Sequence, residues 1–348
     1  MTIIGARPQF VKAATVSRAM REHHSKIREI IVHTGQHYDA NMSEIFFEEL
    51  EIPRADYNLG IGGGSHGQNT GRMIETVEAV LIKEKPDWVL VYGDTDSTLA
   101  GTLAAVKLHI PIAHIEAGLR SFNRGMPEEI NRVLTDHASN LLFTPTDTAT
   151  SNLLKEGINK NRIKQVGDVM YDAALFYRSK AQRPRTIRTD GGFVLATIHR
   201  AENTDNPNRL TEIFGALNEI AATKPVILPL HPRTKKLLAQ NKNNSDRITI
   251  LEPVGYLQMI WLLEHCDLVV TDSGGLQKEA YFFGKPCITT RDETEWVELV
   301  KLGANIITGA SSISIQNAII HFKNTSVQAQ DFYGSGHAAD AIVKTLME

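Results

Sequence analysis

The sequence contains only two cysteines among its 348 residues, Cys266 and Cys287, and this number excludes a framework of disulfides. Both lie in apolar stretches, which predicts that they are small buried core residues. No run approaches the roughly 20 apolar residues that a membrane-spanning helix needs. The first residues, MTIIGARPQF, lack the basic segment followed by an apolar segment of a signal peptide. We therefore expect a soluble, cytoplasmic protein that does not bind a membrane.

An excess of charge of one sign is also missing. Lys and Arg number 37 and Asp and Glu number 40, which gives a formal net charge of −3. Proteins that bind nucleic acid through a general basic field carry an excess of Lys and Arg, so we expect no nucleic-acid partner. A local cationic pocket for a small anionic ligand is compatible with this balance. The hydrophobic share of 42% and the charged share of 22% are typical of a folded globular chain.

Two widespread nucleotide-binding motifs are absent. No Gly-x-Gly-x-x-Gly follows the first predicted strand, and no Gly-x-x-x-x-Gly-Lys-Ser/Thr occurs in the chain. The first absence disfavours a nicotinamide dinucleotide, and the second disfavours P-loop chemistry on ATP. The histidine-containing turns do not have the spacing of zinc ligands. We therefore expect neither a metal nor a nicotinamide cofactor.

Short apolar runs recur along the chain, each followed by a polar turn and then by a segment with helical periodicity. Runs rich in Val, Ile and Leu, without alternation, predict strands that are buried on both faces. Their alternation with helices predicts an α/β fold with parallel sheets. The predicted strands are Thr2–Ile4, Ile30–His33, Trp88–Tyr92, Ile112–Ile115, Leu141–Phe143, Phe193–Ile198, Val226–Leu230, Ile248–Leu251, Leu268–Thr271, Cys287–Thr289 and Asn305–Thr308.

A polar and basic segment, RSKAQRPRTIRTDGG at 178–192, separates the two halves and is typical of a linker. We expect a first Rossmann-like domain over 1–177 and a second over 178–335, with a crevice between them. The final segment, 336–348, predicts a helix, which in two-domain folds of this kind can cross back to the first domain, but the sequence alone does not place it. The fold class is thus two Rossmann-like parallel-sheet domains.

Residues that directly follow the predicted strands are the candidates for function, because ligands of an open parallel sheet bind beyond the carboxyl ends of its strands. After the first strand, a turn at Gly5 with Arg7 and Lys12 indicates either an anion site or an ordinary turn with surface cations. Asp94 and Asp96 follow the third strand. Their spacing suits a metal pair or a helix N-cap, and we favour a cap for Asp96 and a crevice role for Asp94.

Further acidic residues come behind the next strand. Glu116 follows that strand directly, and Glu128 begins a predicted helix in which Arg132 lies one turn later. An ion pair of Glu128 with Arg132 on a solvated helix face is the simpler interpretation. If these carboxylates instead meet Asp94 at one partly dry crevice, they suit general acid–base catalysis.

The second half carries features of a phosphate site. His199-Arg200 and His231-Pro232-Arg233 follow two successive strands, and together they favour phosphate contact over a structural role. In the segment TDSGGLQKEA, Ser273-Gly274-Gly275 opens a predicted helix, where unobstructed backbone N–H groups and the helix dipole favour a diphosphate. Glu279 in this helix is placed to accept hydrogen bonds from two ribose hydroxyls. The alternative is a glycine-rich turn with an exposed Glu279.

Nine ordered segments resemble motifs of the non-hydrolysing UDP-N-acetylglucosamine 2-epimerases: GARPQFVK, TGQHYD, YGDTDST, HIEAGLRS, MPEEINR, TIHRAEN, LHPRT, TDSGGLQKEA and TRDETEW. The resemblance implies the glycosyltransferase-B type of fold, a UDP-sugar in the crevice and a homodimer. It also implies that no NAD, metal or pyridoxal cofactor takes part. In this family UDP leaves by anti elimination to give a 2-acetamidoglucal, and it adds back after protonation of C2 from the opposite face.

The resemblance also implies roles for individual residues. The diphosphate leaving group is held by Arg7, Lys12, His199 and the amides of Ser273, Gly274 and Gly275. Proton transfer and stabilisation of the cation fall to Asp94, Glu116 and Glu128, and Lys12 and His199 are counted with them as catalytic. Arg132 orients the acidic group, Glu279 contacts the ribose, and Met259 and Trp296 complete the substrate-binding set.

Two segments depart from the family pattern. Thr294-Glu295-Trp296-Val297-Glu298 stands in place of Thr-Glu-Arg-Pro-Glu, so that Trp296 replaces an arginine that touches substrate. This version resembles the branch that acts on UDP-2,3-diacetamido-2,3-dideoxy-glucuronate for surface polysaccharide. There an indole suits the C3 acetamido group, and a cation such as Arg124 or Arg120 suits the C6 carboxylate. The segment 62–68, GGGSHGQ, departs from the region linked to activation by UDP-N-acetylglucosamine, and we do not expect that activation.

The favoured function is therefore a 2-epimerase of the diacetamido uronate, with UDP-N-acetylglucosamine as the alternative substrate. A glycosyltransferase on the same fold requires an acceptor and transfers the sugar to it. A hydrolysing epimerase releases UDP and free sugar. A non-catalytic UDP-sugar sensor keeps the Ser273–Glu279 helix start but can dispense with Asp94, Glu116 and Glu128, all of which are present.

Overall fold

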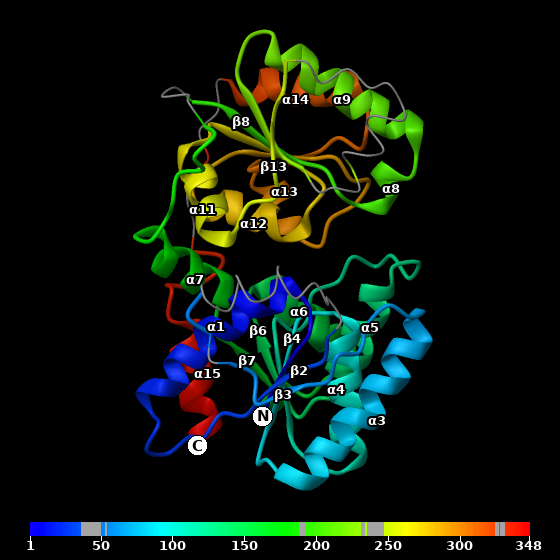
Figure 1. Cartoon of the computed structure of the whole chain (residues 1–348), viewed down its shortest axis with the longest axis vertical. Helices are drawn as coiled ribbons and strands as arrows, with labels where there is room; N and C mark the ends of the chain where they lie inside the picture. The colour runs from blue at the N-terminus through cyan, green and yellow to red at the C-terminus, as the bar shows by residue number, and fades with distance from the viewer. Residues whose placement is uncertain are drawn as a thin grey trace. The chain divides into compact units, whose positions relative to one another are not determined.

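The computed structural model describes residues 1–35, 50–52, 54–187, 192–230, 234, 247–323, 327 and 331–348. The side chain of Arg7 and the predicted turn 231–233 lie outside the described residues. The chain forms two compact units (Figure 1). Unit 1 comprises Met1–Phe176 and Asp331–Glu348, and unit 2 comprises Tyr177–Gln330.

Unit 1 is built on a seven-stranded sheet in the order β3-β2-β1-β4-β5-β6-β7, and all of its strand pairs are parallel. The strands are β1 Thr2–Ile4, β2 Ile31–His33, β3 Tyr57–Asn58, β4 Val89–Tyr92, β5 Ile112–Ile115, β6 Leu141–Thr144 and β7 Ile163–Gln165. The strand order reverses between β1 and β4, which are neighbours in the sheet. This reversal is a topological switch point, where open parallel sheets bind ligands.

The helices of unit 1 are α1 Arg7–Glu22, α3 His66–Glu84, α4 Asp96–Lys107, α5 Pro127–Ala138, α6 Asp147–Lys155, α7 Val169–Arg178 and α15 Ala338–Met347. A short 3₁₀-helix, η1, spans Lys160–Arg162. α7 crosses the boundary of the two units, and α15, the predicted terminal helix, lies against α1 (Figure 1).

The start of α4 corrects one expectation. Asp96 is not the N-cap: the cap is Thr95, whose hydroxyl accepts a hydrogen bond from the Thr98 N–H at 3.3 Å. The extended backbone of Thr95 aims its short side chain at that amide, as a helix cap requires. Asp96 is the first helical residue instead, and its carboxylate is available to other elements.

Unit 2 is built on a six-stranded parallel sheet in the order β10-β9-β8-β11-β12-β13. Its strands are β8 Val194–Thr197, β9 Val226–Pro229, β10 Thr249–Leu251, β11 Leu268–Thr271, β12 Cys287–Thr289 and β13 Asn305–Ile307. Its helices are α8 Ala201–Thr204, α9 Pro207–Ala221, α11 Tyr256–His265, α12 Gly274–Phe282, α13 Val297–Lys301 and α14 Ser312–Phe322. The switch point of this sheet lies between β8 and β11.

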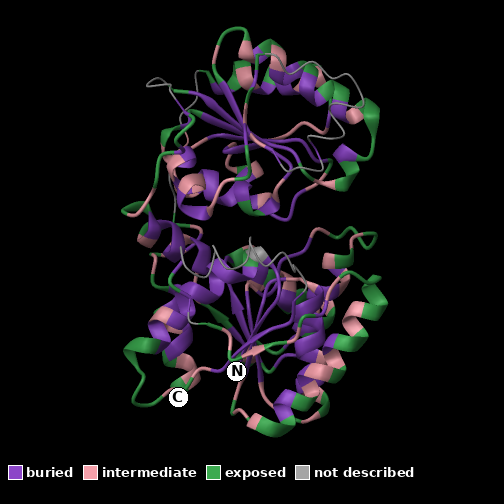
Figure 2. Cartoon of the chain, in the orientation of Figure 1, coloured by how far each residue is buried: buried purple, intermediate pink, exposed green. Residues whose placement is uncertain are grey.

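The central strands of both sheets are buried, while the outward faces of the helices are exposed (Figure 2). Each predicted strand is present, with ends that differ by at most one residue. The edge strands β3 and β7 were not predicted, because their partly exposed residues do not form an apolar run. Cys266 and Cys287 are buried as expected, and burial raises the pKa of each thiol to about 12. Among the described helices, none combines the length and apolar character that crossing a bilayer requires.

Candidate active site

The predicted site residues follow the strands that flank the two switch points. In unit 1, Gly5 follows β1 and Asp94 comes just behind β4. In unit 2, His199 comes just behind β8, and Ser273 comes just behind β11. Since each pair of strands is adjacent in its sheet, each unit presents its candidate residues at the place where its topology favours ligand binding.

Close packing fixes the backbone at the switch point of unit 1. A Cβ atom on Gly5 would collide with the hydroxyls of Thr34 and Ser97, which are themselves hydrogen-bonded at 2.8 Å. Gln9 joins the two flanking strands: its Oε1 accepts from the Gly5 N–H at 2.8 Å, and its Nε2 donates to the Tyr92 carbonyl at 2.9 Å. Only glycine fits this approach, so the turn is a packed junction rather than a plain surface loop.

Lys12 and Glu116 form a nearly buried ion pair beside this junction, with both side chains 8% exposed. Lys12 comes from α1, and Glu116 directly follows β5. Glu116 has a positive φ of 70°, which is costly for a residue with a side chain and is concentrated at functional sites. A Cβ on Gly93 would lie 3.1 Å from the Lys12 Nζ, so the glycine leaves room for the ammonium. The sheet thus brings together two residues that are 104 positions apart.

Arg132 on α5 pairs with Asp94, and its Nη1 lies 3.3 Å from the Glu129 carboxylate. The guanidinium is buried, while Asp94 is partly exposed. Glu129, which the sequence did not single out, is also buried and accepts the N–H groups of Ser121 and Phe122 at 3.0 and 2.9 Å. Arg132 therefore forms ion pairs with both Asp94 and Glu129.

Glu128 lies partly exposed near the start of α5. Within the described residues it makes no hydrogen bond or ion pair, so the simple surface pair with Arg132 is not formed. The carboxylate of Glu128 is available to bind a ligand or to accept and donate a proton.

A buried histidine, His114, holds the carboxyl edge of the unit 1 sheet, where the candidate catalytic residues Asp94 and Glu116 lie. The Nδ1 of His114 lies 2.7 Å from Asp136 Oδ1, and its Nε2 lies 2.7 Å from the Gly93 carbonyl oxygen. Both ring nitrogens thus face acceptor oxygens, one of a carboxylate and one of a backbone carbonyl. Asp136 also accepts the Gly118 N–H at 3.1 Å. This pair thereby ties down the turns that carry Asp94 and Glu116. His114 was not singled out from the sequence. The signal that could have identified it is an isolated histidine within an apolar strand.

Asp136 is the charged centre of this support. Burial alone raises the pKa of its carboxyl, but the charges and hydrogen bonds of His114 and Arg120 outweigh burial and hold that pKa below its usual value. Arg120 is buried between Asp136 and Glu156, with a distance of 2.7 Å to each. It is fully engaged in ion pairs, which is contrary to the expectation that Arg120 offers a cation to a substrate carboxylate.

Asp96 connects three helices next to Asp94. Its Oδ2 lies 2.9 Å from His66 Nδ1 on α3, and its Oδ1 accepts from Asn131 Nδ2 on α5 at 3.1 Å. Asn131 Nδ2 also donates to the Asp94 carbonyl at 3.0 Å. The carboxylate that was expected to cap a helix therefore joins α3 and α5 to the start of α4.

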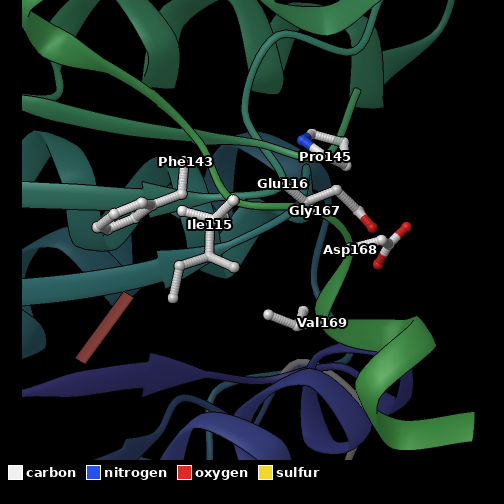
Figure 3. Close-up of a pocket in the computed structure, with 8 residues that line it drawn as sticks. Ile115, Glu116, Phe143, Pro145, Gly167, Asp168 and Val169 are labelled. Carbon is white, nitrogen blue, oxygen red and sulfur yellow. The ribbon is translucent and has the colours of Figure 1, made fainter. Parts of the chain in front are cut away.

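A pocket opens where β5, β6 and β7 end, and two carboxylates line it (Figure 3). Glu116 comes from behind β5 and Asp168 from behind β7. Asp168 Oδ1 accepts the Met170 N–H at 2.8 Å. Sequence reasoning missed Asp168, because it did not recognise the partly exposed strand before it. The remaining lining residues are Ile115, Phe143, Pro145, Val166, Gly167 and Val169. Within the described part of the chain, no three His, Cys, Asp or Glu residues gather as metal ligands.

In unit 2 a buried aspartate ties two candidate segments together. Asp272, at the end of β11, accepts the backbone N–H groups of His199 and Arg200, each at 3.0 Å, and the Asn203 amide at 3.2 Å. The His199 ring is half-exposed, with its Nδ1 3.3 Å from Asp272 Oδ1. His199 is therefore held beside Ser273, which is the residue after Asp272.

The Ser-Gly-Gly segment opens a helix as predicted. Ser273 caps α12 by accepting the Leu276 N–H at 3.4 Å. Gly274 is buried against Glu295, and a Cβ at that position would collide with the glutamate's Oε1, whereas a Cβ on Gly275 meets nothing. Glu279 is buried in this helix, so the alternative with an exposed Glu279 is wrong. The first amides of α12 have no partner within their helix, which is the geometry of an anion site.

Trp296 supports the start of α12 from inside the unit. Only 2% of the residue is exposed, and its indole N–H donates to the Gly274 carbonyl at 2.8 Å. The ammonium of Lys278 lies 4.6 Å from the ring centroid. Met259, on α11, packs partly buried against the core. Contacts of Trp296 and Met259 with substrate stay predictions.

Comparison with known proteins links this chain to UDP-sugar enzymes. The family model for UDP-N-acetylglucosamine 2-epimerase matches residues 18–347. A UDP-2,3-diacetamido-2,3-dideoxy-D-glucuronate 2-epimerase of Pseudomonas aeruginosa is 57% identical over 99% of this chain and 98% of its own. A UDP-N-acetylglucosamine 2-epimerase of Methanocaldococcus jannaschii is 45% identical over 99% of this chain and 97% of its own.

Solved structures give the same result. The M. jannaschii UDP-GlcNAc 2-epimerase in complex with UDP-GlcNAc and UDP matches with a TM-score of 0.92 at 45% identity, over 99% of this chain and 98% of that one. The Neisseria meningitidis enzyme bound to UDP-GlcNAc matches with a TM-score of 0.92 at 32% identity, with coverage of 99% and 98%.

Proposed function

This chain belongs to the UDP-N-acetylglucosamine 2-epimerase family, and on that premise we propose that it inverts C2 of UDP-2,3-diacetamido-2,3-dideoxy-D-glucuronate. The relatives are epimerases, and the chain is accordingly an isomerase that acts on a UDP-sugar. The two parallel sheets and the structural neighbours confirm the predicted glycosyltransferase-B type of fold.

The choice of substrate rests on one observation. The relative named for the diacetamido uronate shares 57% of its residues with this chain, against 45% for the M. jannaschii UDP-N-acetylglucosamine enzyme, at the same coverage of this chain. The segment Thr294-Glu295-Trp296 supports the same choice through the family resemblance, because its tryptophan version resembles the branch that acts on the diacetamido uronate.

In the reaction that we propose, unit 2 holds the leaving group. The proton on C2, the carbon that bears the acetamido group, is only weakly acidic, so departure of UDP and the positive charge that develops at C1 must lead. The amides of Gly274 and Gly275 and the His199 side chain supply donors for the diphosphate. They act with little reorganisation, because Asp272 holds the His199 turn and its ring, and Ser273 caps the start of α12.

Unit 1 supplies the groups that move the proton. Inversion at C2 requires removal of the proton from one face and its return on the other, so at least two acid–base groups take part. Glu116, Asp94 and Glu128 are the candidates. Because Lys12 is paired with Glu116, a diphosphate that attracts the ammonium of Lys12 releases Glu116 to act as a base. Arg132 pairs with Asp94 and holds its carboxylate in place.

The test follows the C2 proton. The enzyme is incubated in deuterium oxide with the diacetamido uronate or with UDP-N-acetylglucosamine, and the products are analysed by NMR. We expect epimerised UDP-sugar that carries deuterium at C2, with a higher kcat/KM for the uronate. Epimerisation without deuterium rejects the proton-transfer mechanism, and a higher kcat/KM for UDP-N-acetylglucosamine rejects the proposed substrate.

UDP-N-acetylglucosamine stays the second candidate, because two relatives at 45% identity are named for it and a relative at 51% identity is named as a homologue of that enzyme. We also propose a cytoplasmic homodimer, as the family resemblance implies, and sedimentation analysis at several concentrations tests the dimer. A glycosyltransferase would need an acceptor and would accumulate UDP, which the same NMR experiment detects.

A further inference from the structure

The proposed substrate carries one more anionic group than UDP-N-acetylglucosamine, the carboxylate at C6, and a site that prefers it needs a further donor. The cations that the described residues place inside the catalytic edge of unit 1 are already paired. Lys12 pairs with Glu116, Arg132 with Asp94, and Arg120 with Asp136. All three are buried, so a further donor from the described part of unit 1 has to come from the rim of this edge.

His66 lies on that rim in a fixed orientation. It is the first residue of α3, and its side chain is 74% exposed. Its Nδ1 is 2.9 Å from the carboxylate of Asp96, whose own side chain is only 10% exposed. A buried carboxylate that engages one ring nitrogen orients the ring. The opposite edge of the ring carries Nε2, and in the imidazolium form both nitrogens carry hydrogen, so that Nε2 donates to an anionic ligand while Nδ1 faces Asp96.

The contacts of Asp96 place this histidine close to the chemistry. Asp96 also accepts from Asn131, and the same Asn131 amide donates to the carbonyl of Asp94. His66 is thus connected to the turn that carries Asp94 through two hydrogen-bonded side chains. The segment that leads into it, 62–65, is Gly-Gly-Gly-Ser, so no bulky neighbouring side chain shields the ring from this side.

We propose that His66 binds the C6 carboxylate of the substrate through its Nε2–H and thereby sets the preference for a uronate. This inference rests on the proposed function. Arg124, the cation suggested by sequence alone, is exposed, and in the described structure no ion pair holds it in one orientation. A donor that is already oriented loses less conformational entropy on binding than a mobile arginine, which favours His66.

The central test uses His66→Asn. The asparagine amide retains a donor toward Asp96 but removes the outer edge of the ring. For the uronate we expect KM to rise about tenfold or more with kcat changed less, since a charge-assisted hydrogen bond contributes roughly 1.5–3 kcal/mol. For UDP-N-acetylglucosamine, which has a hydroxyl at C6, KM should stay within about twofold. His66→Gln, whose amide reaches the Nε2 position, should restore part of the loss and shows that the variants fold.

A second readout does not depend on turnover. UDP-glucuronate and UDP-glucose differ only at C6, and their competitive inhibition constants are measured on each variant. His66→Asn should raise the inhibition constant of UDP-glucuronate about tenfold and leave that of UDP-glucose nearly unchanged. The matched control is His337→Asn, because His337 is also exposed at 75%, begins a helix and pairs with an aspartate, Asp340, at 3.4 Å. That variant should change neither constant.

The outcomes separate the two proposals. If the unmodified enzyme does not epimerise the uronate, the proposed substrate fails. If it does, and His66→Asn weakens both inhibitors equally or neither, the role of His66 is rejected. If Arg124→Gln selectively weakens inhibition by UDP-glucuronate and His66→Asn does not, the carboxylate is bound by Arg124 instead.

Discussion

At the carboxyl edge of the unit 1 sheet the candidate site residues are charged side chains paired with one another, whereas in unit 2 the candidate anion site at the start of α12 consists mainly of backbone amides. In unit 1, Lys12 meets Glu116 and Arg132 meets Asp94, and each pair joins distant parts of the chain. In unit 2, the buried carboxylate of Asp272 points inward and holds the amides of the His199 turn.

This difference matches two chemical tasks. A leaving diphosphate is anionic throughout and gains one further negative charge on its oxygens when the C1–O bond breaks, so fixed amides at a helix start serve it well. A proton that moves between carbon and carboxylate requires groups whose charge changes during the reaction. Ion pairs that a ligand can rearrange provide such groups. We therefore assign proton transfer to unit 1 and binding of UDP to unit 2.

The largest expected effect comes from neutralising the acidic residues of unit 1. Glu116→Gln and Asp94→Asn should each lower kcat by about 10²–10⁴-fold, because each removes a proton-transfer or electrostatic group. Affinity for UDP, measured by calorimetry, should change little. A variant that lost UDP affinity but kept its turnover at saturating substrate would contradict this division of tasks.

The buried charges of Asp136, His114 and Arg120 in unit 1 should contribute to the stability of the fold. Asp136→Asn removes a buried charge opposite His114 and Arg120 and should lower the free energy of unfolding by about 3 kcal/mol at pH 7. The native carboxyl has a lowered pKa, so its contribution is fully present above the unfolded pKa of about 3.9 and is lost as the pH falls below that value.

Urea unfolding at pH 7 and pH 3.5 measures this effect. The gap between the original protein and Asp136→Asn should narrow at the lower pH. Asp267→Asn, which removes the surface partner of Lys224 in unit 2, serves as the control and should cost under about 1 kcal/mol at pH 7. A gap that is constant across pH would mean that Asp136 does not act through its charge.

Two adjacent glycines test the amide site of unit 2. Gly274→Ala forces a collision with Glu295 and should destabilise the protein by about 1–3 kcal/mol. Gly275→Ala has open space around the new methyl group and should leave stability equal or slightly higher. If a diphosphate approaches this helix start closely, Gly275→Ala should nevertheless weaken UDP binding. Thermal melts and UDP titrations separate the two effects, and unchanged UDP affinity in Gly275→Ala would argue against a close approach.

The smallest effect concerns the support of the glycine turn. Trp296→Phe removes the hydrogen bond to the Gly274 carbonyl and should cost about 1 kcal/mol of stability. If the indole only holds this turn, the ratio of kcat/KM for the uronate to that for UDP-N-acetylglucosamine stays the same. A shift of that ratio toward UDP-N-acetylglucosamine in Trp296→Arg would show that position 296 also contacts the substrate.

Much of the fold was predictable, because the relevant information is local. Central strands buried on both faces are continuous apolar runs, and Ser273-Gly274-Gly275 marked a helix start from its composition. The partly exposed edge strands β3 and β7 have no such run, and Asp168 was missed together with β7. The N-cap of α4 is Thr95 and not Asp96. A helix start that differs by one residue changes which side chain caps it, and the spacing of polar residues in the sequence does not fix the start that closely.

The sequence by itself determined the α/β class, the strands and the identity of the polar residues that follow them, since each depends on a few neighbouring positions. Only the tertiary structure decided which charges meet: Lys12 with Glu116, Arg132 with Asp94 and Glu129, and His114 with Asp136. The physical reason is that a parallel sheet orders its strands through crossover packing and not by their sequence. Residues far apart in the chain thus become neighbours at a switch point, and their burial there makes the pairing of opposite charges necessary.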